Sequence, residues 1–156
     1  MSMDWKQVSA GFERDGALRD IYVQGTSLDD WQAVIDLLRP RVPPGAFTID
    51  GDPAELPVDV SVLFSGQPDA PAYCLGVPMG EATLNCHFFS VEEIEFDLDP
   101  GEMVAELLDP LIAFLRLLGT TCGKAVILSM ENMPEATILR FDPELDEVFW
   151  SGSGQG

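Results

Sequence analysis

The side chains best suited to nucleophilic or metal-binding chemistry in this sequence are a single imidazole and three thiols. His87 is the only histidine, so any acid–base role of an imidazole depends on it. If its segment is a β-strand, the neighbours Cys86 and Phe88 point to the opposite face, which excludes a Cys86–His87 catalytic pair. A thiol from Cys74 or Cys122 reaches His87 only if the fold brings it there.

The sequence lacks the motifs of the common catalytic and metal sites. One histidine and three cysteines without CxxC spacing do not form a zinc-binding pattern. The acidic residues between Glu95 and Glu106 partly match a calcium loop, but Pro100 stands where that loop needs a glycine. No GxSxG, GxxxxGK[ST] or GxGxxG motif is present. We therefore expect a protein that is not an enzyme and that uses no metal or cofactor.

The most unusual pattern is a series of acidic residues at alternate positions near the middle of the chain. A period of two is the period of a β-strand, and the residues between the acids are apolar. The sequence therefore predicts a strand that buries Ile94, Phe96 and Leu98 and presents the carboxylates of Glu93, Glu95, Asp97 and Asp99. Aligned carboxylates repel one another unless cations are near, which favours contact with a basic partner. The alternative is a solvated face that keeps the protein soluble, as in salt-adapted proteins.

The charge balance restricts the kind of partner. The chain has 27 acidic and 8 basic residues and a formal net charge of -19. This charge repels phosphates, so we expect no nucleic acid and no anionic membrane as a partner. No apolar run approaches the roughly 18 residues of a membrane span, and the first residues lack the pattern of a secretion signal. With three unpatterned cysteines, these observations predict a cytoplasmic protein with reduced thiols.

Two amphipathic helices are predicted. The first covers 28–38, because Ser27 and Asp30 form a capping pattern and Pro40 ends the helical spacing. The second begins near Asp99 and Pro100, continues to Leu118 and ends at Gly119, with a kink or a break at Asp109 and Pro110.

Paired extended segments are predicted along the rest of the chain. Asp15-Gly16 predicts a hairpin between 5–14 and 17–24, and alternation predicts strands at 47–50, 56–64, 73–77, 82–89, 124–130, 136–141 and 147–150. We expect an α+β fold in a single domain over residues 1–150. Its curved, mainly antiparallel sheet is built from hairpins, with two amphipathic helices packed on one face. Residues 151–156 are expected to form a flexible Gly/Ser tail.

The overall profile is small, acidic and without catalytic motifs. In this respect alone it resembles bacterial immunity and antitoxin proteins, which neutralise a basic toxin or nuclease by binding it. Our first hypothesis is therefore that the carboxylate-rich strand face docks a basic protein. The alternatives are a homodimer or other assembly formed through edge strands or the second helix, and a small hydrolase or ligand-binding domain with His87 in a pocket.

Overall fold

The computed structural model describes residues 3–64 and 69–151, which contain three α-helices and nine β-strands. The helices are α1 (Trp5–Val8), α2 (Leu28–Leu38) and α3 (Leu108–Cys122). The strands are β1 (Arg19–Gln24), β2 (Phe47–Ile49), β3 (Asp52–Pro53), β4 (Tyr73–Met79), β5 (Ala82–Ser90), β6 (Glu93–Leu98), β7 (Val126–Met130), β8 (Met133–Asp142) and β9 (Glu147–Trp150). Short 3-10 helices are η1 (Ser9–Phe12), η2 (Arg39–Arg41), η3 (Val60–Phe64), η4 (Pro100–Glu102) and η5 (Ala105–Leu107).

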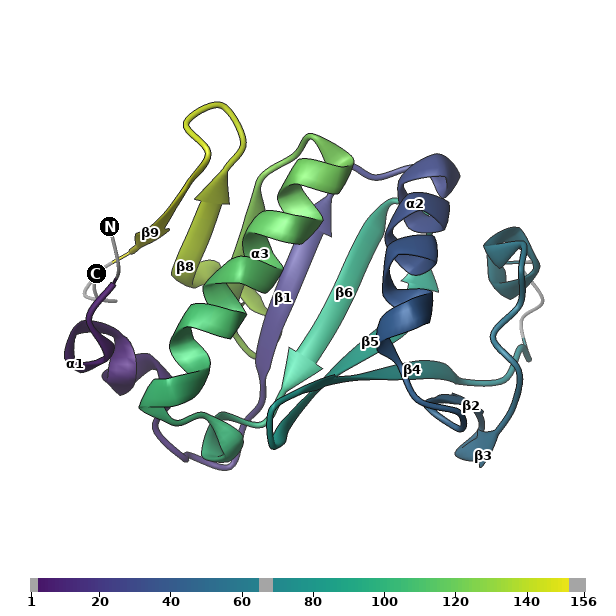
Figure 1. Ribbon diagram of the computed structural model, residues 1–156, viewed down its shortest axis with the longest axis horizontal. Helices are drawn as coiled ribbons and strands as arrows, with labels where there is room; N and C mark the ends of the chain where they lie inside the picture. Colours follow the sequence, from purple (N-terminus) through teal and green to yellow (C-terminus); the bar gives the residue numbers. More distant parts are fainter. Residues whose placement is uncertain (1–2, 65–68, 152–156) are drawn as a thin grey trace.

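All nine strands form one open sheet in the order β3-β2-β4-β5-β6-β1-β7-β8-β9. Every neighbouring pair is antiparallel, and most neighbours are also consecutive in the sequence. There are two exceptions. Strand β2 pairs with β4 as well as with β3, and β1, which comes first in the chain, lies in the middle of the sheet between β6 and β7 (Figure 1). The predicted α+β class and the antiparallel sheet are confirmed.

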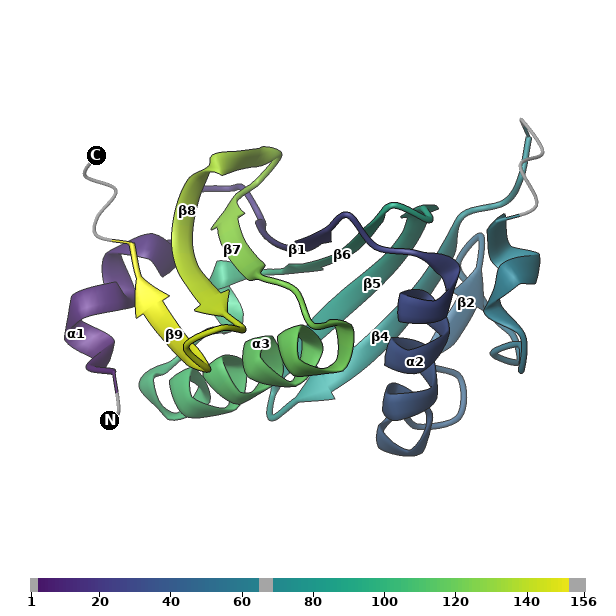
Figure 2. The same cartoon turned by 90° about the horizontal axis from the view of Figure 1, so that it is seen from above.

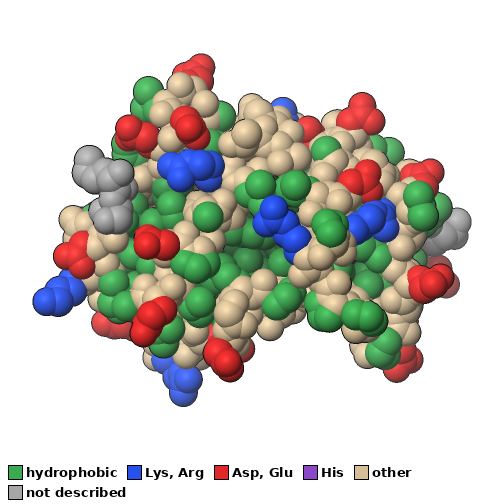
Figure 3. Space-filling model, viewed as in Figure 1, with side chains coloured by type: hydrophobic (Ala, Val, Ile, Leu, Met, Phe, Trp, Pro, Cys, Tyr) green, Lys and Arg blue, Asp and Glu red, His purple; other side chains and the backbone are tan. Residues whose placement is uncertain are grey.

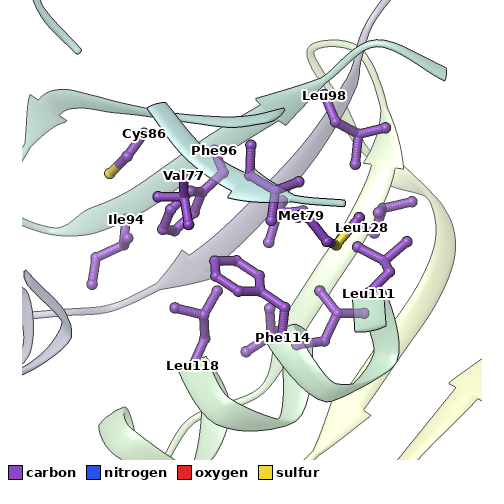
Figure 4. Close-up of a cluster of buried hydrophobic side chains, with 14 of the residues drawn as sticks. Val77, Met79, Cys86, Ile94, Phe96, Leu98, Leu111, Phe114, Leu118 and Leu128 are labelled. Carbon is purple, nitrogen blue, oxygen red and sulfur yellow. The ribbon is translucent and has the colours of Figure 1, made fainter. Parts of the chain in front are cut away.

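Helices α2 and α3 lie against the same face of the sheet (Figures 1 and 2). The core fills the space between them and the strands, and Figure 4 draws its central part around α3. There the ring of Phe96 on β6 meets Phe114 on α3 edge to face, with 5.1 Å between the ring centroids. Under α2, Trp31 is fully buried, stacks on Phe88 and donates a hydrogen bond from Nε1 to the carbonyl of Ser90. Aromatic packing therefore connects α2 to β5 and α3 to β6.

Local capping explains where α2 begins. The Ser27 side chain accepts a hydrogen bond from the backbone N–H of Asp30, and the Asp30 carboxylate accepts one from the backbone N–H of Ser27. This capping box satisfies two N–H groups that a helix start leaves without partners. The predicted helix over 28–38 is confirmed at both ends.

Helix α3 differs from the prediction at both of its ends. Asp99 and Pro100 begin only the 3-10 turn η4, and the α-helix itself begins at Leu108. Pro110 is then the third residue of α3, where a missing N–H costs no helical hydrogen bond. The helix continues beyond Gly119 to Cys122, and Gly123 closes it in the left-handed conformation at φ 66°. Gly119 lies inside α3, where the Phe141 ring of β8 packs closely against it. A Cβ at this position would lie 2.1 Å from that ring, so only glycine fits.

Two predicted strands are wrong. The strand predicted at 5–14 instead contains α1 and η1, because Asp4 accepts a hydrogen bond from the Lys6 N–H and the Gln7 side chain accepts one from the Asp4 N–H. The predicted strand at 56–64 instead contains η3, and Asp59, just before η3, accepts a hydrogen bond from the Ser61 N–H. In both cases a local side-chain hydrogen bond competes with extended pairing.

In the part of the chain that the structure describes, no helix is long and apolar enough to cross a membrane. The predicted Gly/Ser tail lies outside the described residues except for Ser151, whose N–H donates to the carbonyl of Ile138 and continues the β8–β9 pairing.

Candidate functional site

The strand predicted to carry the acidic residues is β6, and it alternates as expected. Ile94, Phe96 and Leu98 are fully buried on the helix side, and Glu93, Glu95 and Asp97 lie partly buried on the other side. Asp99 does not join them. It follows the end of β6 and caps η4, where its carboxylate accepts a hydrogen bond from the Gly101 N–H at 2.8 Å. The structure thus brings three of the four predicted partner-binding residues into one row.

The neighbouring strands add polar residues beside this row. On β1, Asp20 is the cross-strand partner of Asp97, and Tyr22 is that of Glu95. On β5, Asn85 pairs with Asp97, and His87 pairs with Glu95. Because cross-strand partners share a face of the sheet, all of these side chains lie on the face away from α2 and α3. We call this surface the acidic face and define it by Asp20, Tyr22, Asn85, His87, Glu93, Glu95 and Asp97.

Asp20 and Tyr22 are parts of the site that sequence reasoning missed. Asp20 is only 3% exposed, and its carboxylate accepts hydrogen bonds from the Tyr22 hydroxyl and from the backbone N–H of Asn132, both at 2.8 Å. The pKa of the Tyr22 phenol is raised far above its usual value. Burial is the largest cause, and the hydrogen bond to Asp20 and the charge of Asp20 add to it. The available signal was the alternation in β1, where Asp20 and Tyr22 alternate with the core residues Ile21 and Val23.

His87 contacts one of the carboxylates of β6. Its Nε2 lies 2.6 Å from Oδ2 of Asp97, and the Asn85 amide donates to Oδ1 of the same carboxylate at 3.3 Å. The hydrogen bond to Asp97 raises the pKa of the His87 imidazole, while partial burial acts in the opposite direction. With 23% of the His87 side chain and 15% of that of Asp97 exposed, this pair is neither free in solvent nor sealed from it.

The cysteines are placed so that they do not supply an activated thiol. Cys86 is fully buried on the helix side, opposite to His87, as the alternation predicted. Cys74 of β4 is the cross-strand partner of His87 and lies on the same side of the sheet. Burial and the nearby Asp97 charge raise the pKa of the Cys74 thiol, which keeps it protonated at neutral pH.

The pKa of Glu95 is raised by its surroundings on the acidic face. Its pKa rises to about 7, first because burial disfavours the charged form and then because Asp20 and Glu93 are close. Within residues 3–64 and 69–151, no lysine or arginine forms an ion pair with Glu93, Glu95 or Asp97. Apart from the contact between His87 and Asp97, the carboxylates of β6 therefore have no cationic partner among the described residues.

An exposed aromatic ring lies next to these carboxylates. The β5–β6 pairing is interrupted by a bulge between His87 and Ser90, so that Phe88 and Phe89 both lie opposite Ile94. Phe88 is buried in the core, whereas Phe89 is 70% exposed. The Phe89 ring stacks on the His87 ring with 5.1 Å between centroids and an interplanar angle of 2°.

The helix side has a different character. Figure 3 shows apolar side chains between the helices, with acidic and basic side chains scattered around them. Two hollows lie on this side of the molecule, and neither is lined by a residue of the acidic face. One is a groove of about 860 Å³ between α1, α3 and β9, and the other, of about 170 Å³, lies between α3 and β4 next to the end of α2.

Among the described residues, no group of three histidine, cysteine or acidic side chains is arranged to hold a metal ion. The chemistry available on the acidic face is instead ionic and hydrogen-bonding contact with positively charged groups. In three comparisons, no family model, no curated protein and no solved structure matches this chain.

Proposed function

We propose that this protein is a non-enzymatic binding protein whose acidic face docks a basic protein partner. The observation that carries the proposal is the position of the carboxylates. Glu93, Glu95 and Asp97 lie beside Asp20 on a side of the central strands that no described helix covers (Figure 2). They are incompletely exposed and without lysine or arginine partners in the described residues. Such a surface gains most from a partner that brings its own cations.

The aromatic pair beside the carboxylates supports the same conclusion. Lysine and arginine have long apolar stems that pack on hydrophobic surface while the charged end remains at a polar site. A cation placed near Phe89 would meet the ring face and the carboxylates of Glu93 and Glu95 together. Exposed aromatic residues are frequent energetic centres of protein interfaces, and Phe89 is the most exposed aromatic residue among the described residues.

The layout of the domain leaves this surface available. We interpret the fold as a curved sheet with two amphipathic helices on one face. In this arrangement one face of the sheet packs on the core, and the other can contact a partner. The complete burial of Trp31 and Leu38 on α2, and of Leu111 and Leu118 on α3, supports this division of roles. The three cysteines are free thiols, which is consistent with the cytoplasmic location that we propose.

The partner class follows from the charge. A net charge of -19 attracts basic proteins over a distance of about one Debye length, roughly 8 Å at physiological salt, and speeds association with them. Proteins that act on nucleic acids present basic surfaces to phosphates, so an acidic face can compete for that surface. We therefore propose neutralisation of a basic toxin or nuclease as the biological form of this docking.

The proposal is tested by affinity capture with three baits. The first is the wild-type chain. The second carries Glu93→Gln, Glu95→Gln and Asp97→Asn. The third loses the same number of carboxyl groups through Glu55→Gln, Glu81→Gln and Glu144→Gln at exposed turn and loop positions.

A basic protein that the wild type and the turn variant retain, and that the acidic-face variant loses, is the expected result. Equal retention by all three baits would show that net charge, and not the acidic face, is what attracts the partner.

A second candidate function, a small hydrolase or ligand-binding domain, is favoured by the contact between His87 and Asp97. A carboxylate that orients an imidazole is a common arrangement for acid–base chemistry. The raised pKa of Cys74 and the position of both hollows on the helix side do not favour it. His87→Gln separates the two candidates, because it removes the acid–base group and keeps the three carboxylates of β6.

A further inference from the structure

Among the described residues, strand β9 forms an open edge of the sheet. The strand order ends with β9 on one side and with β3 on the other. Strand β3 has only two residues, and one of them, Pro53, has no N–H to donate. Strand β9 has four residues, of which Phe149 is 41% and Trp150 39% exposed. An edge with unpaired backbone groups and exposed aromatic residues is suited to pairing with another strand.

The hydrogen bonds of β9 determine which of its backbone groups are free. The Ser151 N–H donates to the Ile138 carbonyl at 2.9 Å, so Ser151 is turned toward β8. In an antiparallel ladder successive residues alternate, so Glu147 and Phe149 are also turned toward β8. The N–H and C=O groups of Val148 and Trp150 therefore point to the free edge.

The same register determines the faces. Val148 pairs with Phe141 and Trp150 with Leu139, and both of these β8 residues are buried on the helix side. Phe149 pairs with the exposed Arg140 and lies on the other side of the sheet. Hence the two residues with free backbone groups are also the two whose side chains face the helices.

We propose that a second copy of this chain pairs with this edge, with the two β9 strands antiparallel around a two-fold axis at Phe149. Val148 then lies opposite Trp150 of the second copy, and each exchanges an N–H···O=C pair with the other. This register joins the backbone groups that are free and places apolar side chains opposite apolar side chains. Phe149 meets its own copy in a close, non-hydrogen-bonded pair. Glu147 lies opposite Ser151 of the second copy, so the register avoids a pair of like charges.

The groove on the helix side can accommodate a side chain of the second copy. It lies between α1, α3 and β9, and Met3, Ile112 and Val148 contribute apolar side chains to its lining. Trp150 of the second copy, which points to this side, enters the space next to Val148. The partner copy thus adds an apolar side chain to a groove of about 860 Å³ that the described residues leave open.

This inference is independent of the proposed docking function, and the two respond to salt in opposite ways. Two chains of charge -19 repel each other, so added salt strengthens the dimer by screening. Added salt weakens the docking of a basic partner for the same reason. A four-residue edge buries less than the roughly 1,200 Å² of a standard interface, so we expect a weak dimer, with a dissociation constant on the order of 0.1–1 mM.

The test is sedimentation of the full chain at roughly 50 µM to 1 mM in low and high salt. The wild type should show a dimer that grows with concentration and with salt. Phe149→Lys alone and Phe149→Glu alone should be monomers, because each places two like charges opposite one another at the axis. An equimolar mixture of the two variants should restore the dimer.

Two further variants distinguish loss of the dimer from loss of folding. Val148→Pro removes a free-edge N–H that β8 does not use, and should abolish the dimer with an unchanged circular dichroism spectrum. Leu145→Lys changes an exposed residue of the β8–β9 turn and should leave the dimer intact. A wild type that is monomeric throughout, a dimer that survives Phe149→Lys, or a mixture of the two charged variants that stays monomeric would each overturn the inference.

Discussion

Nε2 of His87 and Oδ2 of Asp97 lie 2.6 Å apart across the β5–β6 pair, which joins the only histidine of the chain to the acidic residues of β6. The hydrogen bond raises the pKa of the imidazole because Asp97 stabilises the charged form. The histidine is therefore a natural probe of the acidic face.

Asp97→Asn should lower the pKa of His87 toward its usual value of 6.5. The replacement keeps a hydrogen-bond acceptor but removes the charge that favours the imidazolium ion. A proton NMR titration of the single imidazole measures this directly. Asp99→Asn is the control, since Asp99 caps η4 and is not among the groups that shift the pKa of His87, and it should leave the titration unchanged. An unaltered His87 pKa in Asp97→Asn would show that the pair is not formed in solution.

The stability of the protein should fall as the pH rises from 6 to 8. The pKa of Glu95 is raised from 4.5 to about 7, so its contribution to stability is complete below pH 4.5 and is lost as the pH rises through 7. The raised pKa of His87 acts in the same direction, because the stability that it contributes is lost as the pH rises above 6.5 and through the raised value.

Glu95→Gln isolates the first of these contributions. We expect it to raise the free energy of unfolding at pH 8 by about 1–2 kcal/mol, reduced from the full linkage value because Glu95 is partly exposed. At pH 5 the difference should be small, since wild-type Glu95 is then largely protonated. Urea unfolding at both pH values measures the effect, with Glu81→Gln as a control at an exposed turn. A variant that is less stable than wild type at pH 8 would contradict the repulsion on the acidic face.

Gly119→Ala should destabilise the protein by about 2–4 kcal/mol, although alanine is the better helix former. The added methyl group would lie 2.1 Å from the Phe141 ring and 2.9 Å from the carbonyl oxygen of Lys124, so α3 must move away from β8. Thermal or urea unfolding provides the measurement, and Thr120→Ala, on the exposed side of α3, is the matched control. Combining Gly119→Ala with Phe141→Leu should recover part of the loss. If Gly119→Ala were as stable as the control, the close packing of α3 on β8 would be wrong.

The parts of the fold that the sequence predicted are those fixed by local patterns. The alternation of Glu93 to Leu98 gives the faces of β6, and the capping box of Ser27 and Asp30 gives the start of α2. Gly119 misled the prediction because a glycine in a helix can mark either an end or a close contact. Only the tertiary packing of Phe141 distinguishes the two.

The acidic face could be predicted only in part, for a similar reason. The residues of β6 follow one another in the chain, whereas Asp20 and Tyr22 reach them through the placement of β1 beside β6. No local signal indicates that a strand near the start of the chain enters the middle of the sheet. The position of Cys74 across from His87 likewise depends on the register of β4 and β5. The spacing of Asp99 places it in line with the carboxylates of β6, but in the structure it follows the strand and caps η4.

The affinity of the captured basic partner for three forms of the chain tests the central claim most directly. We would measure dissociation constants by calorimetry at about 50 and 300 mM NaCl for the wild type, the Glu93/Glu95/Asp97 triple variant and the Glu55/Glu81/Glu144 triple variant. Docking through the acidic face predicts at least about tenfold weaker binding and a smaller salt dependence for the first triple variant, and less than about threefold change for the second. Equal losses in the two variants, or none in the first, would contradict it.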